Sequence, residues 1–484
     1  MGLLHDVKHT SRLGLLVAAA AATVGVIYGY DSSNIAGALL FITKDFSLTT
    51  HQQELVTTAV VVGEVIGALF GGWLANRIGR KKSMLAVAAT FAGFSLLSAL
   101  AWSVPTLMAA RFLLGLTIGV SVVVVPVFVA ESAAPEIRGA LLVLYQVATV
   151  TGIILGYLAA WALSGTGSWR WMLGMAAIPG ALIFLLLLRL PDTARWYMMR
   201  GRRADAERVL SQVEPNANIE AELDDIAAAL AEEDRGRRGV LSLLGEMLRK
   251  PFLRATIFVV GLGFFVQITG INAIVYYSPR IFEAMGFHGN FALLGLPALV
   301  QIAGLAAVFV SLILVDRLGR RPILLTGIGI MILANALLVA VFTIGSDFGG
   351  ALTFFGFLGL LLFTVGFTFG FGALVWVYAG ESFPARLRSL GSSAMLTADL
   401  VANVAVAAIF LTLLTRLGGA GTFVVFGVLA VAAFAFVFKL APETKGRPLE
   451  DIRHYWENGG KWPTPSVTET ADQLNRAAPA VSSH

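Results

Sequence analysis

Long runs of apolar residues, separated by short polar segments, extend from about residue 13 to residue 440. A helix that crosses a bilayer needs about 20 predominantly apolar residues, and about twelve segments meet that requirement. The first six are predicted at 13–41, 56–76, 84–102, 107–130, 140–163 and 171–190. The second six are predicted at 253–284, 293–315, 322–343, 352–380, 390–415 and 420–440. The pattern therefore predicts an all-α polytopic membrane protein with twelve transmembrane helices in two six-helix halves.

Two polar segments divide this pattern. Residues 191–252 are rich in charge, and we interpret them as a cytoplasmic linker of short helices. Residues 441–484 form a polar tail. The predicted domains are thus an N-terminal half (1–190), the linker (191–252), a C-terminal half (253–440) and a cytoplasmic tail (441–484).

Lysine and arginine residues are unevenly distributed over the short loops, and this bias sets the orientation of a membrane protein. One side carries Arg77, Arg80, Lys81, Lys82, Arg138, Arg317, Arg320, Arg321, Arg386 and Arg388. The other side carries Lys44, Arg170, Arg280 and Arg416. The bias predicts a multi-pass protein of the cell inner (plasma) membrane with both termini in the cytoplasm.

The composition supports the bilayer as the solvent of this chain. Hydrophobic residues make up 57% of it and charged residues 13%, whereas a soluble protein carries about a quarter charged residues. The net charge of +5 follows from the loop bias, so no nucleic-acid partner is expected. No phosphate-binding loop, His-Glu-x-x-His motif or cysteine-based metal site is present. We therefore expect no enzyme, no cofactor and no metal, and a gradient as the energy source.

The two halves share three motifs in the same order. The segment from Asn76 to Lys81 recurs 240 residues later as Asp316 to Arg321, and Pro191-Asp-Thr recurs 251 residues later as Pro442-Glu-Thr. The third motif is an acid followed seven residues later by an arginine, and it recurs after 250 residues. This near-constant offset indicates a duplicated half, which suits a carrier that rocks around a site near the midplane.

Acidic and basic residues of these motifs fall at the predicted cytoplasmic helix ends. Pairing across the two halves would favour the state that is closed to the cytoplasm. The residues assigned to this cytoplasmic gate are Arg77, Glu131, Arg138, Arg317, Glu381 and Arg388. The alternative is that these charges only set the topology, and we favour that interpretation for Lys81 and Lys82.

Four ionisable residues lie well inside predicted spans, where a charge costs roughly 2.5–3.5 kcal/mol. Asp31 and Arg111 both fall in the outer half of the bilayer and can pair. Proton coupling needs a switch between a paired and an unpaired state of two such residues. The alternative is that they form a static salt bridge. Glu64 lies beside small packing residues and has either a direct role or none beyond packing. Asp399 lies four residues before Asn403, so both share a helix face.

At the residues described above, the sequence resembles the sugar porter family of the major facilitator superfamily. The resemblance runs from Gly29-Tyr-Asp31 to Pro442-Glu-Thr-Lys-Gly446. It rests most on Arg111 with Gly115, on Pro126 to Glu131, on Gln267 to Tyr277 and on Trp376 to Glu381. It implies the major facilitator fold, alternating access, a monosaccharide or polyol substrate, and no obligate protein partner.

Residues that match family positions are candidates for the site. The resemblance assigns proton coupling to Asp31 and Arg111. It assigns sugar hydrogen bonds to Gln146, Gln267, Asn272 and Asn403, and aromatic pocket positions to Tyr28 and Trp376. Amides both donate and accept hydrogen bonds, which suits a substrate made of hydroxyls. Tyr276 shares a helix face with Asn272, and Asp399 shares one with Asn403, so both are further candidates for substrate binding. Asp399 either binds hydroxyls or carries a second proton. The alternative is that the amides join helices to one another and that Trp376 anchors the membrane interface.

Three departures from the family pattern bear on the substrate. The family has two consecutive glutamines where this chain has Val266-Gln267, and an Asn-Trp pair where it has Asp399-Leu400. The Pro-rich approach to the helix 10 tryptophan is replaced by Ala373-Leu-Val375. One hydroxyl-binding amide is lost and one carboxylate is gained. A polyhydroxylated substrate is still expected, with glucose itself in doubt.

The function expected from the sequence is proton-coupled symport of a monosaccharide or polyol across the lipid bilayer. The alternatives are a facilitative uniporter or an exporter of a related small metabolite. A sugar receptor that does not transport is a further alternative, although no signalling module is visible in the tail.

Overall fold

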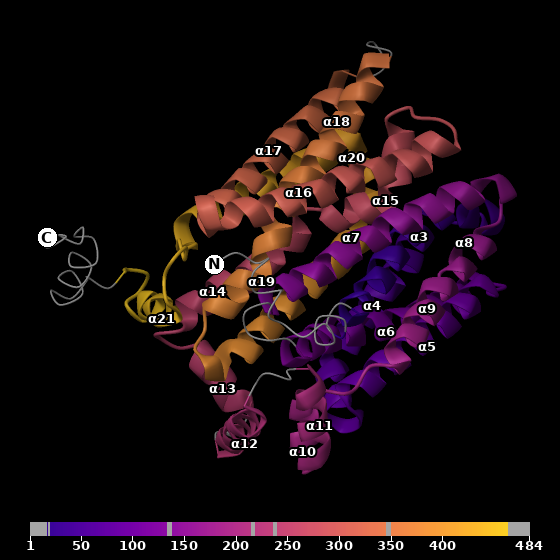
Figure 1. The fold of residues 1–484 in the computed structure, drawn as a ribbon. Coiled ribbons are helices and arrows are strands. Elements are labelled where there is room, and N and C mark those ends of the chain that lie inside the picture. Colours follow the sequence, from indigo (N-terminus) through magenta and orange to yellow (C-terminus); the bar gives the residue numbers. More distant parts are fainter. Residues whose placement is uncertain are drawn as a thin grey trace, which may run out of the picture.

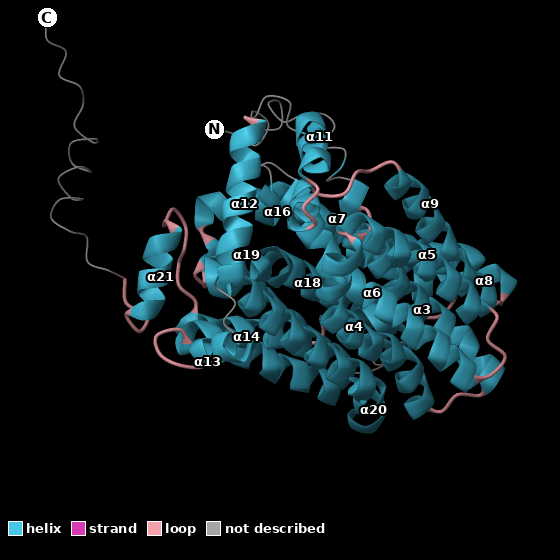
Figure 2. Cartoon of the chain, turned by 90° about the horizontal axis from the view of Figure 1, so that it is seen from below, coloured by secondary structure: helices cyan, strands magenta, loops and turns pink. Residues whose placement is uncertain are grey.

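A computed structural model describes the fold of residues 17, 20–132, 138–213, 218–235, 240–344 and 350–462. Two groups of long helices lie side by side, one from the first half of the sequence and one from the second (Figure 1). The regular elements in the described ranges are all helical, and no strand occurs among them (Figure 2).

The first group makes six passes along the long axis of the bundle. It comprises α3 (Gly25–Phe46), α4 (Thr50–Ile78), α5 (Arg80–Ala99), α6 (Val104–Ser132), α7 (Arg138–Leu163) with the 3₁₀ turn η1 (Ser164–Thr166), and α8 (Trp169–Met175) with α9 (Ala177–Leu188). Only Ala176 separates α8 from α9, and its backbone is helical, so the two helices form one pass.

Four short helices follow, namely α10 (Ala194–Met199), α11 (Arg203–Val213), α12 (Ile219–Arg235) and α13 (Val240–Met247). A small apolar cluster of Ala194, Ala206, Leu210 and Leu223 joins the first three. These helices gather at one end of the bundle (Figure 1). We call this the linker end, and we call the other the opposite end.

The second group begins with α14 (Leu253–Ile268) and α15 (Ile271–Ala284), and continues with η2 (Phe291–Gly295), α16 (Leu296–Leu318) and α17 (Arg320–Ile344). It ends with α18 (Gly350–Phe367), η4 (Thr368–Gly372), α19 (Ala373–Glu381) and α20 (Ala385–Leu440). A last helix, α21 (Leu449–Glu457), packs Trp456 against Phe258 of α14, with stacked rings 5.5 Å apart.

The described residues contain ten helical stretches that are long and apolar enough to cross a membrane. The helix α3 adds a crossing, and a kink at Gly418, where φ is 69° and ψ is 176°, divides α20 into two. The prediction of twelve transmembrane helices is thus confirmed. Several boundaries differ from those expected. The helix α4 begins at Thr50 instead of residue 56, and the span predicted at 253–284 is broken between Ile268 and Ile271. The helix α3 continues to Phe46, and the spans predicted at 390–415 and 420–440 are joined, because Gly418 turns the chain without a polar loop.

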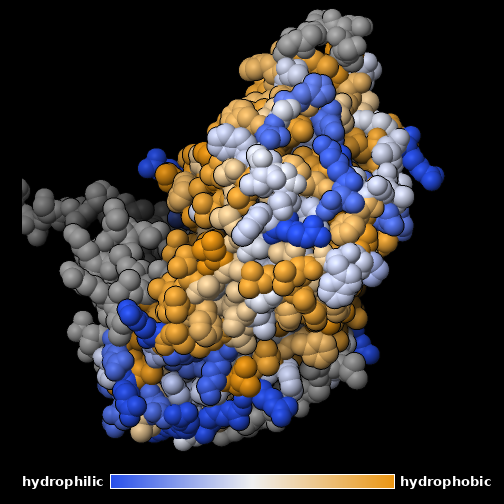
Figure 3. Space-filling view, turned by 90° about the vertical axis from the view of Figure 1, so that its right-hand side faces the viewer, coloured by the Kyte–Doolittle hydropathy of each residue, from blue (hydrophilic) through white to orange (hydrophobic). Residues whose placement is uncertain are grey.

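The outer surface of the bundle is apolar along its middle. Large apolar side chains are exposed on several helices, among them Leu69, Leu182, Ile313, Leu333 and Phe354, each at least 61% exposed. Figure 3 shows apolar side chains over the middle of one face and hydrophilic side chains gathered at the lower end. An exposed apolar surface of this extent marks a contact with a membrane or another protein, and the long apolar helices beneath it favour the membrane.

Glycines allow α4 and α6 to pack with their backbones in contact. A Cβ atom added to Gly67 of α4 would lie 2.2 Å from the carbonyl oxygen of Leu116. Small residues at helix interfaces permit such approaches in membranes, where dispersion contacts replace the hydrophobic driving force. Between the two groups, α4 contacts α20, α7 contacts α16 and α3 contacts α15. These three contacts place the interface of the halves along the centre of the bundle.

We predict that Gly67→Ala destabilises the protein by about 1–3 kcal/mol, because the new methyl group meets backbone that cannot move aside. The matched control is Gly72→Ala on the same helix, where an added Cβ has open space around it. Thermal unfolding of the purified variants in one detergent measures the difference. Equal melting temperatures for the two variants would contradict close packing of α4 on α6.

Candidate functional site

A cavity of about 150 Å³ lies between the two groups of helices, lined by residues from both. Six of the predicted substrate residues line it, namely Tyr28, Gln146, Gln267, Asn272, Trp376 and Asp399. Trp376 is 49% exposed, which fits a side chain at the open part of the cavity. The remaining two predicted residues lie behind this lining: the Asn403 amide donates to the Tyr276 hydroxyl at 3.1 Å.

A break between α14 and α15 places two of these amides at the cavity. The helix α14 ends at Ile268, and Gly270 adopts a φ of 102°, a conformation that suits glycine. Gln267 precedes the break and Asn272 follows it, so their side chains reach the cavity from separate helices. Irregular backbone at membrane depth is tolerated where it lines such a cavity.

Several polar atoms around the cavity have no hydrogen-bond partner in the protein. They include Oε1 of Gln267, Nδ2 of Asn272 and Oδ1 of Asn403. The other end of the Gln267 amide donates from Nε2 to Oδ2 of Asp399 at 3.3 Å. A free acceptor and a free donor within one cavity are what a hydroxyl group can use, since a hydroxyl both donates and accepts.

Several polar residues that were not predicted from the sequence also line the cavity. They are Ser32, Tyr145, Thr149, Gln301 and Thr368. They carry no charge, and hydroxyl side chains are frequent in transmembrane helices. A hydroxyl in a helix can also bond its own backbone, as that of Thr149 does to the Tyr145 carbonyl at 3.0 Å. The sequence therefore gives no signal for which of these side chains line a cavity.

Asp31 of α3 and Arg111 of α6 are in direct contact. The guanidinium Nη1 of Arg111 donates to Oδ1 of Asp31 at 2.5 Å, and both residues are almost fully buried. The Nε of Arg111 has no partner. A charged pair at this depth needs mutual compensation, because the hydrocarbon offers no solvation. The contact that the sequence analysis expected is present, and its role in proton coupling stays a prediction.

Glu64 of α4 is a third buried ionisable side chain in this region. It is 1% exposed, and its Oε2 has no hydrogen-bond partner. It interacts electrostatically with Asp31, Arg111 and Asp399. Asp399 lines the cavity, and these interactions connect it through Glu64 to the pair of Asp31 and Arg111. A direct role of Glu64 stays a prediction.

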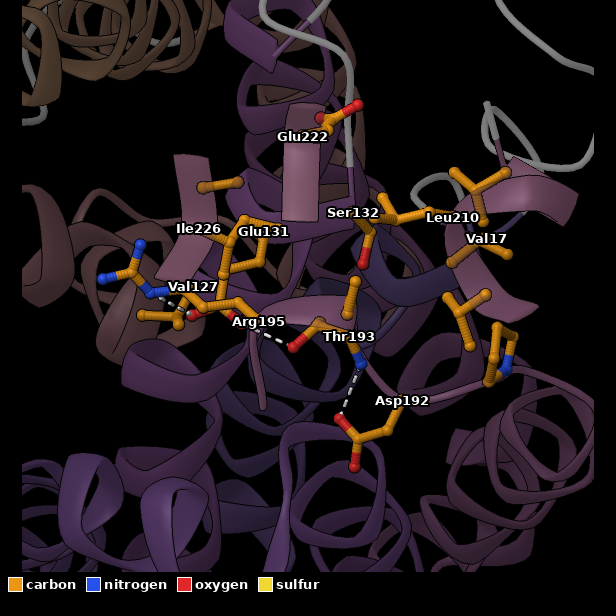
Figure 4. A pocket seen from close by; sticks show the side chains of 15 residues that line it. Val17, Val127, Glu131, Ser132, Asp192, Thr193, Arg195, Leu210, Glu222 and Ile226 are labelled. Atoms are coloured by element: carbon orange, nitrogen blue, oxygen red, sulfur yellow. Dashed lines mark hydrogen bonds and ion pairs between the residues drawn. The ribbon is translucent and has the colours of Figure 1, made fainter. Parts of the chain in front are cut away.

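At the linker end, Glu131 of α6 is the centre of a polar cluster (Figure 4). Arg80 donates from Nε and Nη2 to its two carboxylate oxygens, each at 3.0 Å. The Thr193 hydroxyl donates to Oε2 at 2.6 Å, and the Nε of Arg195 lies 3.9 Å from Oε1. These residues border a cavity of about 420 Å³ between α6 and the linker helices.

The acids of the repeated Pro-Asp-Thr and Pro-Glu-Thr motifs occupy equivalent places in the two groups. Asp192 accepts a hydrogen bond from the backbone N–H of Arg80 at 3.1 Å. Glu443 accepts two, from the N–H groups of Arg320 at 3.0 Å and Arg321 at 3.1 Å. Each acid therefore satisfies free N–H groups at a helix start. Burial raises the pKa of the Asp192 carboxyl, and the backbone N–H groups that bond to it oppose the shift.

The other predicted gate residues make no ion pair among the residues that the structure describes. Arg77 lies over the Trp73 ring, with its guanidinium carbon 5.2 Å from the centroid. Oε2 of Glu381 and Nε of Arg388 have no partner, and the carbonyl of Arg317 accepts from Lys445 at 2.6 Å. The side chain of Arg138 lies outside the described residues. Pairing across the halves therefore stays a prediction for another conformation.

At the opposite end, the two groups are joined by polar contacts that the sequence analysis missed. Glu54 of α4 accepts two hydrogen bonds from Thr412 of α20. Arg280 of α15 donates to Gln53 of α4 at 3.0 Å. Glu54 and Gln53 lie at the start of a helix, where polar residues are ordinary, so their spacing gives no signal of a partner in the other half.

Comparison with known proteins adds independent evidence. The profile of the family described as "Sugar (and other) transporter" matches residues 17–456. The galactose-proton symporter of Escherichia coli (strain K12) is 38% identical over 442 residues, which cover 91% of this chain and 94% of that protein. The arabinose-proton symporter of the same strain is 35% identical over 460 residues, which cover 94% and 96%.

The fold is also similar to solved structures. One is the major facilitator superfamily proton:xylose symporter XylE bound to 6-bromo-6-deoxy-D-glucose, with a TM-score of 0.76 and 26% identity. That comparison covers 92% of this chain and 99% of the solved one. The family match over nearly the whole chain, the curated relatives and the shared fold agree, and the chain belongs to the sugar (and other) transporter family.

Proposed function

We propose that this chain is a secondary transporter that carries a monosaccharide or polyol together with a proton by alternating access. The observation that supports this most is the cavity between the halves, where amide atoms of Gln267 and Asn272 have no partner in the protein. The buried pair of Asp31 and Arg111 supports the coupling to a proton. The related galactose-proton and arabinose-proton symporters support the same pairing of substrate and ion.

The proposed orientation places the linker end in the cytoplasm and the protein in the plasma membrane. It is supported by the excess of lysine and arginine in the loops of that end. Under this orientation, residues 1–190 and 253–440 are the two units that rock, and 191–252 connects them. The residues of the cytoplasmic gate would pair across the halves when the linker end closes.

The proposed roles follow from the charges and hydrogen bonds of the site. The amides of Gln267, Asn272 and Gln146 would bind hydroxyl groups, and Tyr28 and Trp376 would pack against the apolar face of a sugar ring. Asp31 would release Arg111 when it is protonated, because the attraction between them requires the carboxylate. That exchange of partners would link the proton to the rearrangement of the helices.

We predict that Asp31→Asn abolishes accumulation of substrate but leaves downhill exchange. A membrane potential of 100 mV supplies about 2.3 kcal/mol per charge and one pH unit about 1.4 kcal/mol, enough for roughly several hundredfold accumulation. Uptake into proteoliposomes, with and without a pH gradient, measures both activities. Asp45→Asn, which removes an exposed carboxylate of the same helix, should accumulate substrate normally. Accumulation by Asp31→Asn would contradict the assignment.

We predict that Asn272→Ala weakens substrate binding by about one to two decades, since a substrate hydroxyl loses a partner worth about 1–3 kcal/mol. The control is Asn335→Ala, because the Asn335 amide bonds the carbonyl of Met331 in its own helix. Calorimetry or fluorescence titration of both purified variants with a sugar panel gives the affinities. Unchanged affinity in Asn272→Ala would remove this residue from the site.

We predict that Asp399→Asn broadens the range of sugars bound and reduces the pH dependence of binding. A carboxylate accepts but cannot donate unless protonated, so an ionised Asp399 would prefer substrates that present donors and would repel uronates. Binding of neutral sugars and uronates by both proteins is measured across pH. Identical preference orders and pH curves would leave Asp399 as a residue that only bonds Gln267.

A further inference from the structure

Among the described residues, three polar contacts that join the two halves near the opposite end stand out, and only one of them has an ionisable acceptor. Tyr157 of α7 donates to the carbonyl of Val275 in α15 at 2.5 Å, and Arg280 of α15 donates to Gln53 of α4 at 3.0 Å. The third contact joins Glu54 of α4 to Thr412 of α20. It belongs to neither the cavity nor the Asp31 pair.

Both carboxylate oxygens of Glu54 are used by one residue of the other half. The backbone N–H of Thr412 donates to Oε1 at 2.6 Å, and its hydroxyl donates to Oε2 at 2.9 Å. Glu54 is 1% exposed. Hydrogen bonds to an ionised acceptor are shorter and about twice as strong as neutral ones. A buried carboxylate without them would be costly, so the closed arrangement depends on this contact.

The contact between Glu54 and Thr412 can form only when the first span of α20 lies against α4. Its N–H lies inside a helix, where a regular backbone directs each amide to the carbonyl four residues earlier. Here a carboxylate of another helix accepts from that amide. The kink at Gly418 lies six residues further along the chain. The contact therefore holds the end of the first span of α20 against α4, next to the point where the chain turns.

Other charged and titratable groups surround Glu54 without replacing Thr412. The Nδ1 of His51, on the same helix, lies 3.8 Å from Oε2, and the side chain of His51 is 75% exposed. Tyr277 of α15 interacts electrostatically with Glu54, and Arg280 of α15 bonds Gln53 and Glu283. Thr412 is the residue of α20 that faces the carboxylate.

The Glu54 carboxylate has hydrogen-bond partners whether the opposite end is closed or open. When the end is closed, Thr412 compensates the charge. When the end opens, water solvates the carboxylate, and the N–H of Thr412, which lies inside α20, faces a carbonyl of its own helix. Opening therefore exchanges one satisfied arrangement for another. A residue with these properties sets the balance between the two states and does not simply add stability.

We propose that Glu54 is a positioning residue of the transport cycle, whose paired hydrogen bonds to Thr412 close the opposite end of the bundle. This inference rests on the proposed alternating access, and under the proposed orientation that end faces the outside. Loss of the contact should shift the population toward the state that is open at this end. The effect is conformational, since Glu54 does not line the substrate cavity.

The chain contains no cysteine, so one introduced thiol reports on this end without background. Thr58→Cys is suited to this, because Thr58 lies one helical turn from Glu54 on the same face and is 7% exposed. The rate of its reaction with a maleimide is measured on purified protein in nanodiscs, where both ends meet solvent and no substrate is needed.

We expect Glu54→Gln to raise this rate about tenfold or more, because an amide cannot accept both bonds and loses the charge that strengthens them. Thr412→Val, which keeps the backbone donor, should raise the rate roughly fivefold. The double variant should react no faster than Glu54→Gln, since the two residues share one contact. Asp45→Asn, which removes an exposed carboxylate whose contacts to Trp169 and Arg170 stay within the first half, should react like the unmodified reporter.

Equal rates for Glu54→Gln, Thr412→Val and the unmodified reporter would overturn the inference. Sugar uptake by the wild-type chain in proteoliposomes is measured in parallel. Faster labelling of the variants without uptake by the wild type would retain the role of Glu54 and reject the proposed transport. Uptake by the wild type together with equal labelling rates would retain the proposed transport and reject the role of Glu54.

Discussion

A polar group inside a bilayer has no water to bond, so the protein must supply its partner. This constraint explains where the charged side chains of the chain lie. Asp31 is compensated by Arg111, and Glu54 is compensated by Thr412. The buried atoms that stay without a partner include Oε2 of Glu64 and Nδ2 of Asn272. Both lie in or beside the central region, where an unsatisfied group is useful because a substrate or a proton can satisfy it.

The duplicated halves share a hydrogen-bonding motif at the linker end, in which an acid caps the start of a long helix. Asp192 and Glu443, which belong to the same repeated motif, each bond the N–H groups at the start of the third long helix of their half. The halves differ in what surrounds this motif. Glu131 is bonded by Arg80, whereas an oxygen of Glu381 has no partner. The same duplicated sequence therefore produces a tightly bonded first half and a second half with charges free for another contact.

The sequence predicts the parts of this structure that depend on composition along one helix. Apolar runs gave the twelve crossings, and the cost of intramembrane charge selected Asp31 and Arg111, which are in contact. It could not predict contacts that depend on how separate helices meet. The pairing of Glu54 with Thr412 joins residues 358 positions apart, and the continuity of α20 depends on the conformation of Gly418. The roles assigned to the cavity residues stay predictions, because geometry alone does not reveal what they bind.

The polar contacts at the two ends of the bundle differ in whether they must break when the two halves move apart. At the linker end, Glu131 bonds Arg80 of the first half and Thr193 of the linker, and Glu443 bonds Arg320 of the second half. None of these contacts joins one half to the other, so the halves can separate there without breaking them. At the opposite end, the contacts of Glu54 and Gln53 cross between the halves and must break before that end can open. Breaking a charge-assisted bond is costly unless water replaces it at once. The cost of leaving the present state is therefore concentrated at the opposite end, in a few residues at the ends of α4 and α15 and beside the kink of α20.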